Sequence, residues 1–168
     1  MSAGHQGSPA AAVREARLED VPQIFALIRE LAEYEKLAHE VVATEDLLEQ
    51  TLFGERRTTE VILADSGGEI VGFALFFHSY STFLGRPGIY LEDLFVKPAH
   101  RSKGIGKALL AHIARLALER ECGRLEWSVL DWNEAAIRFY RSLGAVPIEG
   151  WTVHRVTGDA LRRLAALR

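Results

Sequence analysis

The chain has 168 residues, 48% hydrophobic and 26% charged, which is an ordinary composition for a one-domain globular protein. A net charge of −3 gives no basic surface for nucleic acid, and the single cysteine, Cys122, excludes an internal disulfide and favours a reducing cytoplasm. No apolar run reaches membrane-spanning length. Residues 1–11 lack a signal-peptide pattern and are expected to be a flexible leader before one domain over residues 12–168.

The elements predicted for the first half of the chain are strands and helices in alternation. Apolar residues at steps of three and four give the first helix a buried face, and Asp65-Ser-Gly-Gly68 is typical of a turn between two strands. The buried face should hold Val21, Ile24, Leu27, Ile28 and Leu31. In chain order the elements are a strand (Val13–Arg17), a helix (Leu18 to about Glu35), a second helix (opened by Thr44, ended near Gly54) and two strands (Thr59–Ala64 and Ile70–His78).

The second half repeats the alternation and begins with a strand, a helix and a strand that should form a parallel, right-handed βαβ unit. The predicted elements are a strand (Leu91–Val96), a helix (Ile105–Arg120), a strand (Arg124–Leu130), a helix (Glu134–Leu143), the segment Trp151–Val156 and a last helix from about Gly158 to Leu167. This order predicts an α/β fold in which helices flank both faces of a central mixed sheet.

A basic, glycine-rich segment, Arg101-Ser-Lys-Gly-Ile-Gly-Lys107, connects the predicted strand to the helix that follows it. Such a turn points backbone N–H groups and the positive end of a helix dipole at one spot, which suits a pyrophosphate. The segment is not a P-loop, because Ala108 stands where Ser or Thr is needed, and not a dinucleotide fingerprint, because Leu109 replaces its third glycine. An ordinary glycine turn before a surface helix is the remaining alternative.

A second motif, Asn133-Glu-Ala-Ala136-Ile-Arg-Phe-Tyr140, is followed by Leu143-Gly-Ala145. Helical spacing places Ala136 and Tyr140 on the same stripe as Asn133, whose side chain is expected to be the N-cap. Tyr140 then lies about 10 Å further along the helix, at 1.5 Å per residue. An aromatic side chain that fills the core is the alternative for Tyr140 taken alone.

Together the two motifs resemble the GNAT superfamily of N-acetyltransferases, whose acyl-CoA pyrophosphate loop has the pattern Arg-x-x-Gly-x-Gly. From about Val13 to Leu164 the sequence is similar to the spermidine/spermine acetyltransferase group, and within it to the thialysine (diamine) acetyltransferase branch. Tyr90-Leu-Glu-Asp93 and Val129-Leu-Asp-Trp-Asn133 are among the narrower matches. The resemblance implies the GNAT fold with a splayed sheet, acetyl-CoA as co-substrate, no metal, and a homodimer.

The resemblance also implies where acetyl-CoA binds. The strand should offer backbone groups to the pantetheine amides, as in the addition of a strand to a sheet. The loop should hold the pyrophosphate, and Ser102, which stands where the family often has glycine, leaves the loop N–H group in place. The expected cofactor-binding residues are Leu94, Phe95, Val96, Arg101, Ser102, Lys103, Gly104, Ile105, Gly106, Lys107, Asn133, Glu134, Ala135, Ala136 and Tyr140.

Amide formation from a thioester requires a neutral amine, whereas an alkyl ammonium has a pKa near 10.4. Glu92 is the first candidate to take the proton, directly or through water, with Asp93 on the other face of a regular strand. A surface or ion-paired carboxylate is the alternative for Glu92. Tyr140, a neutral donor at pH 7, fits protonation of the leaving thiolate after direct attack through a tetrahedral intermediate. Cys122 is expected to be a packed or surface thiol.

Substrate contacts are likewise implied by the resemblance: Leu27, Ile28, Glu92, Glu126, Trp127, Ser128 and Glu149. The first two also fit the core stripe of their helix. Two departures from the family bear on the acceptor. Thr82 stands where the polyamine branch has an acidic residue, and the segment between Ala145 and Trp151 is shorter than in either branch, so the match of Glu149 depends on where that gap is placed.

With Thr82 in place of an acidic residue, the distant charge of a long polyamine has no carboxylate at this position. A charge-assisted contact of that kind is worth roughly 1.5–3 kcal/mol, so its absence favours a short lysine-like amine or diamine over spermidine. Three alternatives stay open: a spermidine/spermine-type polyamine acetyltransferase, a non-catalytic acyl-CoA-binding module, and a protein or peptide N-acetyltransferase with an open acceptor groove. No nucleic acid or membrane is expected as a partner.

Overall fold

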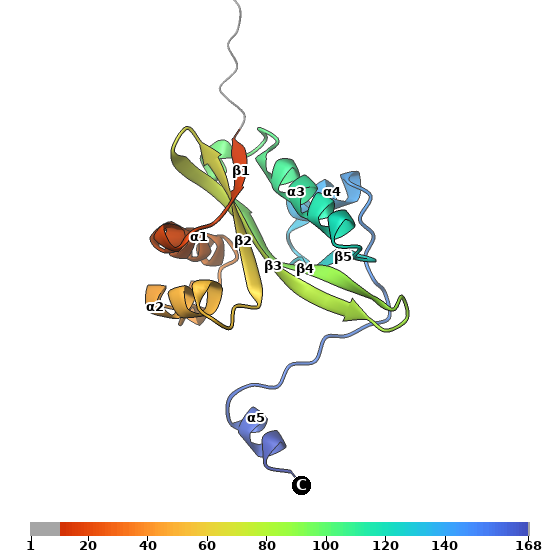
Figure 1. The fold of residues 1–168 in the computed structure, drawn as a ribbon. Coiled ribbons are helices and arrows are strands. Elements are labelled where there is room, and N and C mark those ends of the chain that lie inside the picture. Colours follow the sequence, from red (N-terminus) through yellow and green to blue (C-terminus); the bar gives the residue numbers. More distant parts are fainter. Residues whose placement is uncertain (1–10, 168) are drawn as a thin grey trace, which may run out of the picture. The chain divides into compact units, whose positions relative to one another are not determined.

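The computed structural model describes residues 11–167, so the leader expected at the N-terminus lies almost entirely outside the described residues (Figure 1). The chain divides into two compact units, one that ends at Ser128 and one that begins at Val129. In the described part of the chain, no helix is long and apolar enough to cross a membrane.

The N-terminal unit is built on a five-stranded mixed sheet with the strand order β1-β2-β3-β4-β5. Neighbouring strands are antiparallel except β4 and β5, which are parallel, as the predicted βαβ unit requires. Helices lie on both faces, with α1 and α2 opposite α3 (Figure 1). The strands are β1 (Ala12–Glu15), β2 (Thr59–Ser66), β3 (Glu69–Ser81), β4 (Arg86–Val96) and β5 (Leu125–Trp127). The helices are α1 (Val21–Tyr34), α2 (Glu45–Leu48) and α3 (Ile105–Glu119).

The predicted order of elements is confirmed, and the differences lie in their lengths. β3 and β4 extend beyond the predicted apolar segments because their pairing continues as far as Ser81 and Arg86. β5 has three residues, fewer than the predicted Arg124–Leu130, because its pairing with β4 stops where Leu91 meets Trp127. Backbone pairing, and not hydrophobic pattern alone, therefore sets the ends of these strands.

The core on one face of the sheet forms where the apolar stripe of α1 meets β2, β3 and β4. Four of the five residues predicted for that stripe are buried, and Ile28 is half-buried and packs against the edge of the same cluster. The cluster also contains Phe73 of β3 and Phe95 of β4, which therefore point toward α1. The buried members from α1 are Val21, Ile24, Leu27 and Leu31.

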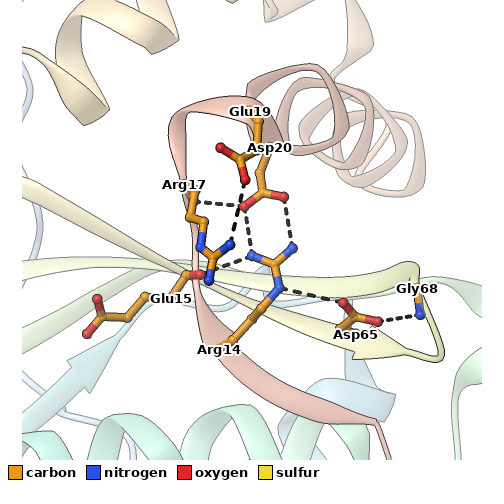
Figure 2. Close-up of polar contacts among 7 residues, drawn as sticks. All are labelled: Arg14, Glu15, Arg17, Glu19, Asp20, Asp65 and Gly68. Atoms are coloured by element: carbon orange, nitrogen blue, oxygen red, sulfur yellow. Dashed lines mark hydrogen bonds and ion pairs between the residues drawn. The ribbon is translucent and has the colours of Figure 1, made fainter.

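A group of charged side chains ties β1 to the start of α1 and to the β2–β3 turn (Figure 2). Arg14 donates two hydrogen bonds of 2.8 and 2.9 Å to the buried carboxylate of Asp20, which also accepts the backbone N–H of Arg17 at 2.7 Å. The Nε atom of Arg14 lies 3.5 Å from Asp65, and Asp65 accepts the backbone N–H of Gly68 in the predicted turn. The hydrogen bonds from Arg14 keep the pKa of Asp20 below its usual value.

The C-terminal unit contains α4 (Glu134–Ser142) and α5 (Gly158–Ala165). The predicted N-cap of α4 is confirmed, because the Asn133 side chain accepts the Ala136 N–H at 3.2 Å. Gly144 stops the chain from continuing α4: it has φ = 90°, and the N–H of the next residue, Ala145, donates back to the Tyr140 carbonyl. The segment Trp151–Val156 has no helical or strand pairing.

Candidate active site

The loop before α3 has the geometry of an anion-binding helix N-terminus. Gly104 precedes α3 with φ = 78°, and Ser102 also has a left-handed backbone with φ = 61°. The first backbone bond within the helix runs from the Ala108 N–H to the Gly104 carbonyl, so the N–H groups of the preceding turn have no partner in the helix. These N–H groups and the helix dipole suit a phosphate group.

Arg101 anchors this loop to β4 and to the end of α1. Its Nε–H donates to the Val96 carbonyl at 2.9 Å. Its guanidinium carbon lies 4.5 Å from the centre of the Tyr34 ring and 5.5 Å from that of Phe95. Arg101 therefore fixes the loop by cation–π contacts and one hydrogen bond as well as adding positive charge to it. The role of Tyr34 was not predicted, because its partner is distant in the sequence.

The part of β4 that precedes the loop has a neighbouring strand on one side. Among the described residues, β4 pairs with β3 as far as Val96 but pairs with β5 only over Ile89–Leu91. The predicted pantetheine-binding segment, Leu94 to Val96, therefore lies where the two parallel strands no longer pair. An open strand edge of this kind can hydrogen-bond a peptide-like ligand.

A β-bulge interrupts β4 at the expected catalytic residue. Leu91 pairs with Phe76 and Asp93 pairs with Leu75, which leaves Glu92 without a partner in the ladder. The assumption of a regular strand is therefore wrong here. Because paired residues share a face, the extra residue puts Leu91 and Asp93 on opposite faces, although a regular strand would put them on the same face.

The face on which Asp93 lies follows from its partner in the ladder. Leu75 packs against the core cluster beneath α1, and so does Phe95, two residues beyond Asp93. Asp93 is therefore on the α1 face of the sheet, where it is half-buried, while Glu92 is exposed.

Three carboxylates from two elements interact at this point. Burial first, and then the negative charges of Glu92 and Glu35, raise the pKa of Asp93 to about 6. Glu35 directly follows α1, and its own pKa is raised by burial. Among the described residues, none forms an ion pair or a side-chain hydrogen bond with Asp93. The grouping of Asp93 and Glu35 with Glu92 could not be predicted from the sequence, because the bulge that turns Asp93 toward α1 leaves no mark in the residue pattern.

The predicted substrate contacts on α1 differ in exposure. Leu27 is 2% exposed, so its side chain packs in the core, as the apolar stripe of α1 also predicted. Ile28 is half-buried at the edge of the same core and keeps part of its surface accessible.

The predicted contacts on and after β5 lie beside β4 and already have partners. Glu126 is held by Arg124, with Nε and Oε2 2.8 Å apart. The hydroxyl groups of Ser128 and Tyr90 are 2.7 Å apart, and Tyr90 lies opposite Glu126 in the parallel ladder. Trp127 lies opposite Leu91, directly before the bulge. β5 and the residue that follows it thus place three of the predicted contacts beside the part of β4 that precedes the bulge.

The remaining predicted residues belong to the C-terminal unit. Tyr140 lies seven positions after the N-cap of α4 and is half-buried, with its ring centre 5.4 Å from that of Phe139. Asn133 to Ala136 form the cap and first turn of that helix. Glu149 follows α4 in a stretch without helix or strand.

The described residues offer little for metal or thiol chemistry. No group of three His, Cys, Asp or Glu side chains there could hold a metal ion. Cys122 is a free, half-buried thiol between α3 and β5, and its sulfur makes only a weak contact of 3.9 Å with the Arg120 carbonyl.

Comparison with known proteins identifies the family. The acetyltransferase (GNAT) family model matches residues 22–145. A thialysine N-epsilon-acetyltransferase of Bos taurus is 42% identical over 164 aligned residues, which cover 91% of this chain and 96% of that protein. An L-ornithine N5-acetyltransferase of Arabidopsis thaliana is 36% identical, and the alignment covers 92% of this chain and 88% of that protein. An integron cassette protein from V. cholerae has a similar structure, with a TM-score of 0.79 and 28% identity over 94% of this chain and 99% of that one.

The chain therefore belongs to the GNAT family of acetyltransferases. It is an N-acetyltransferase, and acetyl-CoA is the acetyl donor of its family. The mixed sheet and the predicted resemblance are confirmed by the same findings.

Proposed function

We propose that this enzyme acetylates a primary amine of a short, lysine-like or diamine acceptor. The observation that carries the proposal is the group of carboxylates at the β4 bulge, which form no ion pair within the described part of the chain and lie beside the open edge of β4. An acceptor ammonium would supply the missing positive charge. The similarity to proteins named for thialysine and for L-ornithine supports a short acceptor with a terminal amine.

Acetyl-CoA supplies an activated acetyl group when bound. The backbone from Leu94 to Val96 would pair with its pantetheine amides, and the loop from Arg101 to Lys107 would hold its pyrophosphate. The left-handed backbone at Ser102 and Gly104 supports this assignment, because such residues in a turn can bring successive N–H groups together into an anion-binding concavity before the N-terminus of α3. Asn133 to Ala136 and Tyr140 would contact the same molecule from α4.

The chemical roles follow from the side chains. Glu92 contacts the acceptor ammonium at the bulge, where a carboxylate is needed to remove a proton before the amine can attack. Tyr140 donates a proton to the leaving sulfur, because a phenol hydroxyl group can act as a general acid. Substrate contacts from Ile28, Glu126 and Ser128 would position the acceptor. Leu27, Trp127 and Glu149 complete the proposed set.

A panel of amines tests the proposal. CoA release from acetyl-CoA is measured with thialysine, lysine, ornithine, putrescine, spermidine, spermine and a lysine-bearing peptide. We expect kcat/KM to be highest for a short diamino acid. Highest turnover with spermidine would instead make the enzyme a polyamine acetyltransferase, and turnover of the peptide alone would require a protein acceptor. No turnover with any amine, together with retained CoA binding, would make the protein a non-catalytic CoA-binding module.

One position offers a matched test of acceptor length. Thr82 is exposed directly after β3, where the polyamine branch has an acidic residue. Thr82→Asp should raise kcat/KM for spermidine by about 10-fold relative to lysine, because a charge-assisted contact contributes roughly 1.5–3 kcal/mol. Thr82→Asn adds similar bulk without charge and should leave the ratio unchanged.

We further propose that the enzyme is a cytoplasmic homodimer. The similarity to the spermidine/spermine acetyltransferase group supports the dimer, and the lone Cys122 supports a reducing compartment. Light scattering would give twice the 18.7 kDa chain mass if the proposal is correct. The chain mass itself would contradict it.

A further inference from the structure

The end of α1 contributes an aromatic side chain to the loop that precedes α3. Tyr34 is the last residue of α1 and packs against the core cluster beneath that helix. The guanidinium carbon of Arg101 lies 4.5 Å from the centre of the Tyr34 ring, within the range at which a cation is attracted to an aromatic face. The proposed function gives Tyr34 no role, although its partner is the first residue of the proposed pyrophosphate loop.

The two rings beside Arg101 are held by the core, so they form a fixed surface for its guanidinium. Phe95 is 4% exposed and belongs to the core cluster, and its ring centre lies 5.5 Å from the guanidinium carbon. Tyr34 is half-buried at the edge of the same cluster. An arginine side chain that rests on such rings loses much of its rotamer freedom before any ligand binds.

A third contact decides which N–H groups of Arg101 are left for a ligand. Its Nε–H donates to the Val96 carbonyl at 2.9 Å, which fixes the inner end of the guanidinium. Within residues 11–167 its two Nη groups form no hydrogen bond or ion pair, and the residue as a whole is exposed. Aromatic rings attract a guanidinium through their faces rather than through acceptor atoms, so the Nη donors stay available to an anion.

An oriented guanidinium suits the ligand proposed for this loop. A pyrophosphate presents pairs of anionic oxygens, and a guanidinium matches such a pair with two parallel N–H donors. The lysines of the same loop, Lys103 and Lys107, are exposed and have no planar fork of donors. Orientation of Arg101 before binding therefore affects the affinity for the phosphates of CoA and not the chemistry at the thioester.

We propose that Tyr34 is a positioning residue for the cofactor, whose ring holds the Arg101 guanidinium in place to bind the pyrophosphate of acetyl-CoA. The proposal rests on the proposed function, since it requires the phosphates to bind at the loop before α3. It gives the C-terminal end of α1 a part in cofactor binding, whereas the acceptor contact proposed on the same helix, Ile28, lies earlier in it.

The affinity for CoA, measured by calorimetry, tests the proposal without any turnover. Tyr34→Leu keeps an apolar side chain against the core but removes the ring, and it should weaken CoA binding by about 5-fold. Tyr34→Phe keeps the ring and should bind CoA within about 2-fold of wild type. Phe25→Leu is the matched control, because Phe25 is another α1 ring packed against the same cluster, and it should leave CoA affinity unchanged. Thermal unfolding of each variant establishes that it is folded.

A double-mutant cycle shows whether Tyr34 acts through Arg101. Arg101→Gln removes the charge and should weaken CoA binding by about 10-fold. In that background Tyr34→Leu should have no further effect, because the ring has no guanidinium to hold. Equal losses from Tyr34→Leu with and without Arg101 would overturn the proposal, and so would an unchanged CoA affinity in Tyr34→Leu alone.

A donor without phosphates separates positioning from a general structural role. S-acetylpantetheine carries the same thioester and pantetheine arm but no pyrophosphate. At saturating amine, Tyr34→Leu should lower kcat/KM for acetyl-CoA by about 5-fold through KM, with kcat unchanged, and should leave kcat/KM for S-acetylpantetheine unchanged. An equal loss with both donors would contradict the proposal, because the ring would then act on the site as a whole.

Amine turnover and CoA binding report on the proposed function and on Tyr34 separately. A wild-type enzyme that acetylates no amine would remove the proposed function, whereas the calorimetric measurements would still test the positioning role. Turnover of an amine together with a CoA affinity that does not depend on Tyr34 would overturn the positioning role alone.

Discussion

Two aspartates of the N-terminal unit show how surroundings decide the use of a carboxylate. Asp20 is buried against Arg14 and the Arg17 N–H group, and its pKa is lowered by these partners (Figure 2). Asp93 is half-buried near Glu92 and Glu35, and its pKa is raised to about 6 by burial and by those charges.

The difference lies in the partner that each site contains. Asp20 has its cation within the fold and stabilises the junction of β1 and α1. Asp93 has none among the described residues, so the folded protein is less stable with it ionised, and an external cation would relieve that cost. The comparison indicates that a paired carboxylate serves structure and an unpaired one is available for a substrate.

The largest expected effect is on stability at the paired site. Asp20→Asn should reduce the free energy of unfolding at pH 7 by up to about 3 kcal/mol, because it leaves Arg14 without its partner. Arg14 is partly exposed, with 33% of its side chain accessible, which reduces the loss. Urea unfolding at pH 7 measures it.

The pH dependence provides the control for this prediction. Because the folded pKa of Asp20 is lowered, its contribution is present above the unfolded pKa and is lost as the pH falls through the folded value. The difference between wild type and Asp20→Asn should therefore shrink in acid. An equal difference at pH 7 and at pH 2 would show that the charge of Asp20 is not its cause.

The next largest effect is a loss of turnover without a loss of CoA affinity or stability, and it is expected at Tyr140. Tyr140→Phe should lower kcat by about 100-fold, equivalent to about 2.7 kcal/mol, because the leaving sulfur would lose the proton donor that we propose for it. CoA affinity and the midpoint of unfolding should stay close to wild type. A parallel loss of CoA affinity would mean that the hydroxyl group has a binding role instead.

A smaller effect of the opposite sign is expected at the unpaired site. Asp93→Asn should raise the free energy of unfolding at pH 8 by about 2 kcal/mol, since each unit of pKa shift corresponds to about 1.4 kcal/mol and partial exposure reduces the total. A raised carboxyl pKa penalises the ionised form, so the gain should develop as the pH rises from about 4 through 6 and be absent below that range. Destabilisation by Asp93→Asn at pH 8 would contradict the comparison.

The smallest effect concerns the backbone and leaves both carboxylate sites unchanged. Ser102 has φ = 61°, a left-handed conformation that costs a non-glycine residue about 1–2 kcal/mol. Glycine would remove this strain, but its greater freedom in the unfolded chain would offset about 0.5–1 kcal/mol of the gain in stability. Ser102→Gly should therefore stabilise the protein by less than about 1 kcal/mol and preserve CoA binding. Ser102→Ala, which retains the strain, is the matched control and should show no gain.

Local features of this fold could be predicted from the sequence. The buried stripe of α1, the turn closed by Asp65, and the cap formed by Asn133 each depend on residues a few positions apart, and each was found where the pattern placed it. The family was also identifiable, because its loop and helix motifs are contiguous. A single domain over residues 12–168 stays a prediction, as do the site roles.

Features that depend on pairing between distant segments could not be predicted. The bulge at Glu92 exists only in the register between β4 and β3, and it decides which face Asp93 occupies. The contact of Arg101 with Tyr34 likewise joins two segments that the sequence separates. Alternation along one strand cannot reveal either of them.

Titration of the aspartate carboxyl carbons by NMR tests the central claim most directly, with Asp20→Asn and Asp93→Asn used to assign the two signals. We predict that Asp20 titrates below the ordinary carboxyl range and Asp93 near pH 6, and that a saturating amine with CoA moves the Asp93 titration to lower pH. CoA carries no acetyl group, so no transfer occurs during the measurement. An Asp93 signal that titrates with ordinary carboxyl groups, or that does not respond to the amine, would contradict the account.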